Sequence, residues 1–92
     1  MRFEWDEEKR RINLEKHGVD FVDAVKLFNR PVVVSQDPKK DYGEKRFACY
    51  GYLGEIFVAL AFTRREPDII RVISLRKANQ RERRRYEEAI AD

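Results

Sequence analysis

The chain has 92 residues, of which 40% are charged, and its 20 Lys and Arg residues exceed the 17 Asp and Glu residues by three. This length predicts a single domain over residues 1–92 with one modest core. One cysteine and one histidine exclude an intramolecular disulfide and a structural zinc site built from Cys and His alone. The longest apolar run, Ile56–Phe62, is too short to span a membrane. The N-terminus lacks the apolar centre of a secretory signal, so we expect a cytoplasmic protein.

The first stretch of the chain predicts a helix that is capped at both ends. Before it, Phe3–Trp5 alternates apolar and polar side chains and is a candidate for a short edge strand. Asp6 is a favourable N-cap, and Gly18 stands where a left-handed residue often closes a helix. We therefore expect a helix over about residues 7–17.

A second helix is predicted to follow at once. Asp20 is its expected N-cap, with Asp23 three residues later in a variant of the capping box. The residues after Asp20 have the spacing of an amphipathic α-helix, whose apolar stripe would comprise Phe21, Ala24, Val25 and Phe28. Pro31 prevents this helix from continuing.

The rest of the chain predicts a sheet and a final helix. Runs of β-branched, aromatic and apolar residues predict four strands, at residues 32–35, 46–53, 55–63 and 69–75. Gly54 marks a tight turn between the middle two strands, and the unbroken apolar run after it indicates a central strand covered on both faces. Asn79 followed by Glu82 resembles a capping box and predicts a helix over about residues 80–90. The expected fold is α+β, with two N-terminal helices, a four-stranded mainly antiparallel sheet and a C-terminal helix.

The excess of positive charge lies at the C-terminal end of the chain. Residues 71–92 hold seven Lys or Arg against four Asp or Glu, whereas the two kinds balance over residues 1–70. Such a concentration of charge suits a polyanion such as a nucleic acid, and it suits an acidic protein partner equally well.

The segments Trp5-Asp6, Lys16–Val19 and Arg71–Ala78 belong to a pattern that extends along nearly the whole chain. In this pattern the sequence resembles the BrnT family of bacterial toxins. The opening segment matches the family at Trp5, Asp6, Lys9, Asn13, Lys16, His17, Gly18, Val19, Phe21 and Ala24. Later segments match at Gly43, Glu44, Arg46, Gly51, Thr63, Arg71, Ile73, Ser74, Arg76, Ala78, Glu82, Arg83, Arg84, Tyr86 and Glu87. Leu75 and Asn79 depart from the Ala and Thr that are more frequent in the family, and neither change removes a group that the chemistry needs.

The resemblance implies a compact ribonuclease fold similar to that of RelE toxins. It further implies RNA cleavage without a metal or other cofactor, growth arrest, and neutralisation by a BrnA-like antitoxin. That antitoxin would carry a ribbon-helix-helix part that binds operator DNA, so that the complex represses its own operon.

Metal-free RNA cleavage by attack of the 2′-hydroxyl needs one group to take a proton, another to give one, and positive charge around the phosphorus. Guanidinium groups suit the third task because they stay charged and form paired hydrogen bonds with phosphate oxygens. The candidate catalytic residues are His17, Glu44, Arg46, Arg71, Ser74, Arg76 and Tyr86. The candidates for RNA binding are Lys16, Lys45, Arg64 and Arg83.

Several of these candidates also have a purely structural explanation. His17 suits acid–base catalysis, but an imidazolium is also favoured at the C-terminus of a helix. Tyr86 would stack on a base or give a proton, or else cover the edge of the sheet. In the last strand, regular alternation places Ser74 and Arg76 on one face and Arg71 on the other. Arg71 and Arg76 can share a site only if the strand twists sharply, bulges, or ends before Arg76.

Three functions therefore compete on the sequence. Composition and spacing slightly favour a non-catalytic nucleic-acid-binding module, because binding requires fewer coincidences than catalysis. A small module that binds an acidic protein is a third interpretation. The family resemblance reverses this order and favours an endoribonuclease toxin.

Overall fold

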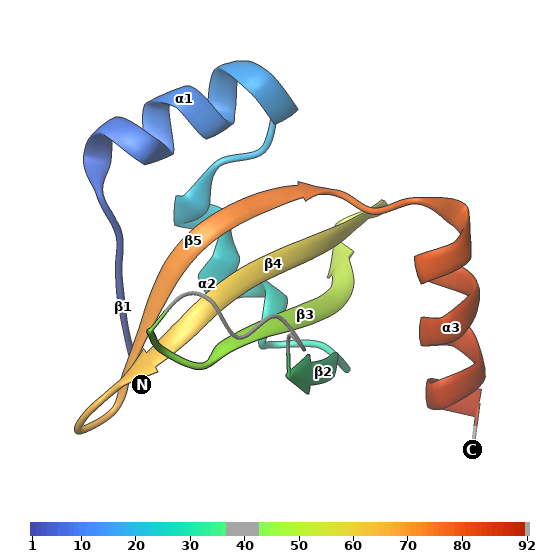
Figure 1. Ribbon diagram of the computed structural model, residues 1–92. Helices are drawn as coiled ribbons and strands as arrows, with labels where there is room; N and C mark the ends of the chain where they lie inside the picture. Colours follow the sequence, from blue (N-terminus) through green and yellow to red (C-terminus); the bar gives the residue numbers. More distant parts are fainter. Residues whose placement is uncertain (37–42, 92) are drawn as a thin grey trace.

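The computed structural model describes residues 1–36 and 43–91. The polar, turn-forming composition of residues 36–44 predicts a loop, most of which lies outside the described residues. The structure contains a five-stranded sheet in the order β1-β5-β4-β3-β2 (Figure 1). The strands are β1 (Arg2–Glu4), β2 (Val33–Gln36), β3 (Arg46–Leu53), β4 (Ile56–Arg65) and β5 (Ile69–Lys77). The predicted α+β class is confirmed, and the sheet contains the four predicted strands and a fifth at the N-terminus. The candidate edge strand does form, because β1 pairs with β5 in parallel while the other strands pair antiparallel.

The first helix, α1 (Glu7–His17), begins and ends where its capping residues predict. The Asp6 side chain accepts a hydrogen bond from the backbone N–H of Lys9 at 3.1 Å. Gly18 adopts a left-handed conformation with φ of 73° and donates to the carbonyl of Leu14. Both ends of α1 are therefore determined by local chemistry.

The prediction of one continuous second α-helix is wrong. In its place the chain makes one turn of 3₁₀-helix, η1 (Phe21–Asp23), followed by a single α-helical turn, α2 (Ala24–Leu27). Phe21, Ala24 and Leu27 are each 0% exposed, and their spacing of three matches the 3₁₀ period better than the α-helical one. Val25, which was expected in the buried stripe, is 45% exposed. The first turn, η1, is therefore wound more tightly than the predicted α-helix, while α2 keeps the α-helical form.

The helical segments cover one face and one edge of the sheet. Figure 1 looks onto the opposite face, with α2 behind the sheet and α1 along the side of β5. The core lies between the sheet and η1 and α2, and its largest fully buried apolar side chains are Phe21, Phe62, Leu27, Leu60 and Leu75. The central strand β4 is buried over most of its length, as its unbroken apolar run predicts. No helix in the described part of the chain has the length and apolar character needed to cross a membrane.

Asn13 connects α1 to the edge of β5. It is buried, and its side-chain amide donates to the carbonyls of Leu75 at 2.7 Å and Val19 at 3.2 Å. Its side-chain oxygen accepts from the backbone N–H of Leu75 at 3.2 Å. Because β1 pairs with β5 only as far as Arg71, the Asn13 amide supplies hydrogen bonds that a longer neighbouring strand would have made.

The last helix, α3 (Gln80–Ala91), is attached at the end of the sheet where β5 finishes. Its predicted capping box is confirmed, since Asn79 and Glu82 each accept a hydrogen bond from the other's backbone N–H, at 2.8 and 3.0 Å. Tyr86 is 8% exposed and its hydroxyl donates to the carbonyl of Pro31 at 2.8 Å. Its ring packs against Phe57, with ring centroids 5.1 Å apart. Tyr86 thus fixes α3 to the sheet.

Candidate active site on the arginine face of the sheet

A β-bulge in β5 resolves the conflict over Arg71 and Arg76. Val72 pairs with Phe62 and Ser74 pairs with Ala61, so Ile73 has no partner in β4. The extra residue reverses the alternation of side chains along β5. Val72 and Leu75 are therefore both buried in the core, while Arg71, Ser74 and Arg76 point to the opposite side of the sheet. We call this side, which also carries Arg46, the arginine face.

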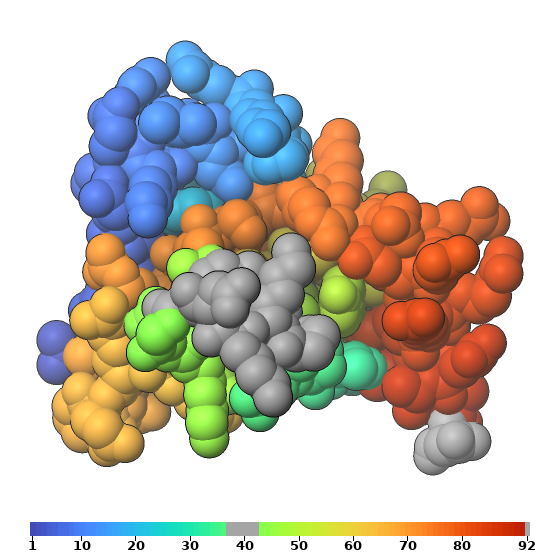
Figure 2. All heavy atoms as spheres, viewed as in Figure 1, coloured from blue at the N-terminus to red at the C-terminus, as the bar shows by residue number. Residues whose placement is uncertain are grey.

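Pairing across β3, β4 and β5 arranges the arginine face in three rows. The first row is Arg46, Thr63 and Arg71; the second is Ala48, Ala61 and Ser74; the third is Tyr50, Ala59 and Arg76. The small side chains of the second row separate the two rows that carry arginine. Arg46 and Tyr50 are four residues apart along β3, which corresponds to about 13 Å. The face is therefore a strip with cationic groups at both ends. Figure 2 views the molecule from this side, with α1 along the top and α3 on the right.

Arg71 is held at one border of the arginine face by a carboxylate. Its guanidinium donates to Glu4 at 2.8 Å, and Arg65 lies 3.6 Å from the same carboxylate. The contact arises because β1 pairs in the register that places Glu4 beside Arg71. In the same row, Thr63 is 1% exposed and its hydroxyl has no hydrogen-bond partner among the described residues.

Arg76 is held at the other border by Glu82 of α3. Two guanidinium nitrogens donate to the two carboxylate oxygens, at 3.0 and 2.8 Å. The hydrogen bond from Arg76 is the main reason that the pKa of Glu82 is lowered, and the same bond raises the pKa of Arg76. Burial, followed by the negative charge of Glu82, raises the pKa of Tyr50. Tyr50 and the Arg76–Glu82 ion pair therefore form one interacting cluster that joins β3, β5 and α3.

The structure does not bring all the predicted catalytic residues to this face. His17 is half-buried at the end of α1, one helical turn after Asn13 and so beside the last part of β5. Glu44 is exposed and lies two residues before β3 begins at Arg46. Tyr86 is at the hairpin end of the sheet, with its hydroxyl engaged by the Pro31 carbonyl. Arg46, Arg71, Ser74 and Arg76 are the four that share the arginine face.

The predicted RNA-binding residues are more dispersed. Arg64 pairs with Ile70 and stacks on the Phe47 ring at 5.5 Å, which places it on the face that η1 and α2 cover. Lys16 is exposed on α1, and Lys45 is exposed just before β3. Arg83 of α3 lies over the Tyr52 ring at 5.7 Å and 3.6 Å from Glu87. None of the four stands in the three rows of the arginine face.

Two residues of the arginine-face network were not among the sequence candidates. Tyr50 is predicted only to be part of a strand. It lies four residues after Arg46 on β3, and this even spacing puts both side chains on the same face of the sheet. Glu82 was interpreted only as a capping residue. The capping box already explains the presence of Glu82 in the sequence. Nothing in the sequence therefore indicates that Glu82 also forms an ion pair with Arg76.

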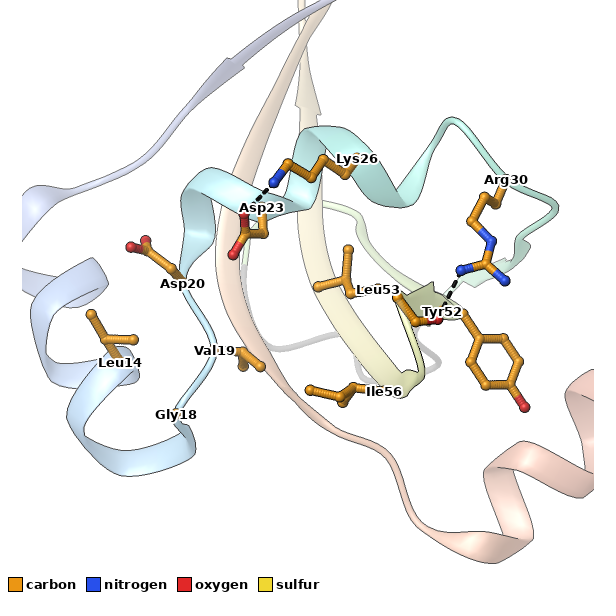
Figure 3. A pocket seen from close by; sticks show the side chains of 11 residues that line it. Leu14, Gly18, Val19, Asp20, Asp23, Lys26, Arg30, Tyr52, Leu53 and Ile56 are labelled. Atoms are coloured by element: carbon orange, nitrogen blue, oxygen red, sulfur yellow. Dashed lines mark hydrogen bonds and ion pairs between the residues drawn. The ribbon is translucent and has the colours of Figure 1, made fainter.

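A hollow on another side of the molecule has a different character. It measures about 430 Å³ and lies between the end of α1, η1, α2 and the β3–β4 turn (Figure 3). Its apolar lining comprises Leu14, Val19, Leu53 and Ile56. Its charged rim is engaged internally, since Lys26 pairs with Asp23 at 3.3 Å and Arg30 donates to the carbonyl of Gly54 at 2.8 Å. This hollow therefore has fewer cationic groups available to bind a phosphate than the arginine face has.

Neither a metal centre nor a thiol nucleophile is evident. In residues 1–36 and 43–91, no three His, Cys, Asp or Glu side chains gather as metal ligands would. Cys49 is fully buried, and burial raises the pKa of its thiol to about 12. A thiol in this environment is a packing group, because nucleophilic cysteines depend on the thiolate form.

Similarity to known proteins identifies the family. The family model described as "Ribonuclease toxin, BrnT, of type II toxin-antitoxin system" matches residues 5–82. The chain belongs to the BrnT family. The crystal structure of the ribonuclease toxin BrnT from Brucella abortus is similar, with a TM-score of 0.67 and 34% identity, covering 87% of this chain and 99% of that chain. Among curated proteins no match was found.

The match to the BrnT model confirms the resemblance that the sequence analysis found. The BrnT family consists of ribonuclease toxins of type II toxin–antitoxin systems, which implies an RNA target and a protein antitoxin. The segment matched by the BrnT model includes Arg46, Arg71, Ser74, Arg76 and Glu82, and it ends before Tyr86.

Proposed function

We propose that the arginine face is the active site of a metal-independent endoribonuclease. The observation that carries the proposal is the bulge at Ile73, which puts Arg71, Ser74 and Arg76 on the face that also carries Arg46. A regular strand would have turned Arg71 into the core. A bulge next to a cluster of cations is typical of strands that re-aim side chains at functional sites.

The proposed reaction is attack of a ribose 2′-hydroxyl on the adjacent phosphorus, with departure of the 5′-oxygen. Guanidinium groups of Arg46, Arg71 and Arg76 would stabilise the negative charge that develops on the phosphoryl oxygens. Ser74 lies between them in the row of small side chains and would donate a hydrogen bond to the same phosphate. Glu44 and His17 are the candidates for proton transfer. For Tyr86, the hydrogen bond to Pro31 favours the docking role.

Glu4 and Glu82 would hold two of these arginines in position before RNA binds. Each carboxylate fixes one guanidinium at a border of the face, at 2.8 Å for both pairs. Arg71 and Arg76 remain 33% and 40% exposed, so part of each group is available to a phosphate. Preorganised cations need not be reoriented when the charge of the transition state develops.

Regulation by a BrnA-like antitoxin belongs to the same proposal. A type II system requires a protein antitoxin, and we propose a partner with a ribbon-helix-helix part that binds operator DNA. Toxin and antitoxin would form a hetero-oligomer that represses its own operon, and the toxin would act in the cytoplasm. We also propose that the fold is of the RelE type.

Cleavage of single-stranded RNA by the purified protein in EDTA tests the proposed reaction. We expect cleavage by the wild type, and a large loss in Arg46→Ala with the fold retained. Arg11→Ala is the matched control, because Arg11 is exposed on α1 and pairs with Glu8 and Glu15 there. RNA that stays intact but is bound tightly and in a salt-dependent way would instead support the non-catalytic binding module.

A further inference from the structure

We infer that the cavity between α3 and the arginine face is a subsite for a nucleobase of the RNA chain. This inference rests on the proposed function, because it assigns a place to the base that neighbours a phosphate bound by Arg76. The cavity measures about 460 Å³, within the range of small-molecule sites. Its lining includes Val33, Ser35, Tyr50, Glu82, Arg85 and Tyr86.

The sheet forms one wall of this cavity. Val33 and Tyr50 are directly opposite each other on β2 and β3, and they present an aliphatic and an aromatic side chain next to one another. Tyr50 is only partly buried, and its ring stacks on Phe57 at 6.5 Å with an interplanar angle of 15°. Phe57 therefore supports the ring from within the protein, while the cavity side of Tyr50 remains available.

Polar groups stand around this apolar wall. Ser35 is exposed and lies two residues from Val33 along β2, so both side chains are on the same face. Glu82 is only 18% exposed and connects the cavity to Arg76, with which it forms the 2.8 Å ion pair. Arg85 is exposed at the α3 side and forms no ion pair with another described residue.

This combination fits a nucleobase better than a simple anion or an aliphatic group. A base has flat π-faces that stack on aromatic rings, and a polar edge that forms hydrogen bonds. Tyr50 offers the stacking surface, Ser35 lies where a polar edge can be recognised, and Arg85 lies where a further phosphate can be bound.

Removal of single bases from the RNA tests the subsite without altering the protein. In a single-stranded RNA that the protein cleaves, one abasic nucleotide is placed in turn at each position around the cleaved bond. We expect one position at which the abasic RNA is cleaved with a kcat/KM lower by roughly 5- to 100-fold, the range that stacking of one base covers. If no position shows such a loss, the inference is overturned.

Variants of Tyr50 assign the effect to the cavity. Tyr50→Ala should lower kcat/KM for intact RNA by a similar factor, and the abasic position should then cause no further loss, because both changes remove one contact. Tyr50→Phe keeps the ring, so in this variant the abasic position should still cause its loss in kcat/KM. If the losses from Tyr50→Ala and from the abasic position multiply instead, the base is bound elsewhere and the inference fails.

If Tyr50→Ala unfolds the protein, two variants of α3 test the cavity instead. Arg85→Gln should weaken RNA binding and reduce its salt dependence, whereas Arg84→Gln should change neither, since Arg84 is equally exposed but does not line the cavity. Equal effects of the two variants would overturn the role of the cavity.

Binding measurements separate failure of this inference from failure of the proposed function. If the wild type binds RNA in EDTA without cleaving it, the proposed reaction is wrong, and the same cycle of Tyr50 variants and abasic RNAs is measured as Kd. If the Tyr50 and Arg85 variants leave RNA binding unchanged but weaken binding of the antitoxin, the cavity serves the protein partner and the inference is overturned.

Discussion

Substitution of Arg76 by Ala separates the catalytic from the structural contribution of one residue. Arg76 is 40% exposed and forms two hydrogen bonds with Glu82, which is 18% exposed. In the variant, Glu82 loses its cationic partner but keeps the hydrogen bond from the backbone of Asn79. The structural effect should therefore be measurable but modest.

The two magnitudes differ enough to be distinguished. A partly exposed ion pair with two hydrogen bonds is worth about 1 kcal/mol. For a domain of this size, that loss lowers Tm by roughly 4–8 °C. Removal of a guanidinium that stabilises the transition state lowers kcat by a factor on the order of 100 to 1,000. The loss of activity in Arg76→Ala should therefore far exceed the loss of folded protein.

The assay is cleavage of single-stranded RNA in EDTA at a temperature well below both melting midpoints, with circular dichroism to measure the folded fraction. Arg76→Lys keeps a charge but not the planar pair of donors, so we expect an intermediate rate. Retention of cleavage by Arg76→Ala within about threefold of the wild type would refute the role of the arginine face. A loss of activity that follows the loss of folded protein would refute it as well.

Three further outcomes follow from single contacts. Asn13→Ala leaves both backbone groups of Leu75 without a side-chain partner, so urea denaturation should show a loss of roughly 2–4 kcal/mol; a loss below about 1 kcal/mol would contradict the edge-capping role. Tyr86→Phe frees the Pro31 carbonyl and should cost about 1 kcal/mol while RNA cleavage continues, whereas abolished cleavage would show a catalytic hydroxyl. The folded pKa of Glu82 is lowered from 4.5, so its stabilising contribution is present above the unfolded pKa and is lost as pH falls through the folded pKa. The difference in unfolding free energy between wild type and Glu82→Gln should therefore shrink under acidic conditions, and a difference independent of pH would disprove the assignment.

The elements that the sequence predicted well are those whose causes are local. Asp6 and Gly18 determine both ends of α1 through hydrogen bonds within a few residues of each other. The reciprocal cap of Asn79 and Glu82 acts over three residues in the same way. Gly54 adopts φ of 62° in the turn between β3 and β4, which few other residues accept. Such signals can be interpreted before any tertiary contact is known.

Short-range patterns failed where tertiary packing chose between alternatives. Residues 21–28 carried an apolar spacing compatible with an α-helix, but contact with the sheet buries Phe21, Ala24 and Leu27, and the first turn is a 3₁₀-helix. Asn13 appeared as one polar residue on a surface helix. Because β1 stops pairing with β5 at Arg71, the backbone groups of Leu75 are left for the Asn13 side chain to bind.

The sequence by itself determined the α+β class, the capped helices, the β3–β4 hairpin and the supply of arginines. Only the tertiary structure decided which arginines act together. Alternation along β5 separates Arg71 from Arg76, and the bulge that unites them is a property of pairing with β4, not of β5 alone. The pair of Arg76 with Glu82 likewise depends on where α3 docks through Tyr86. A site built from side chains on several strands and a helix is set by register and docking, which are long-range properties of the chain.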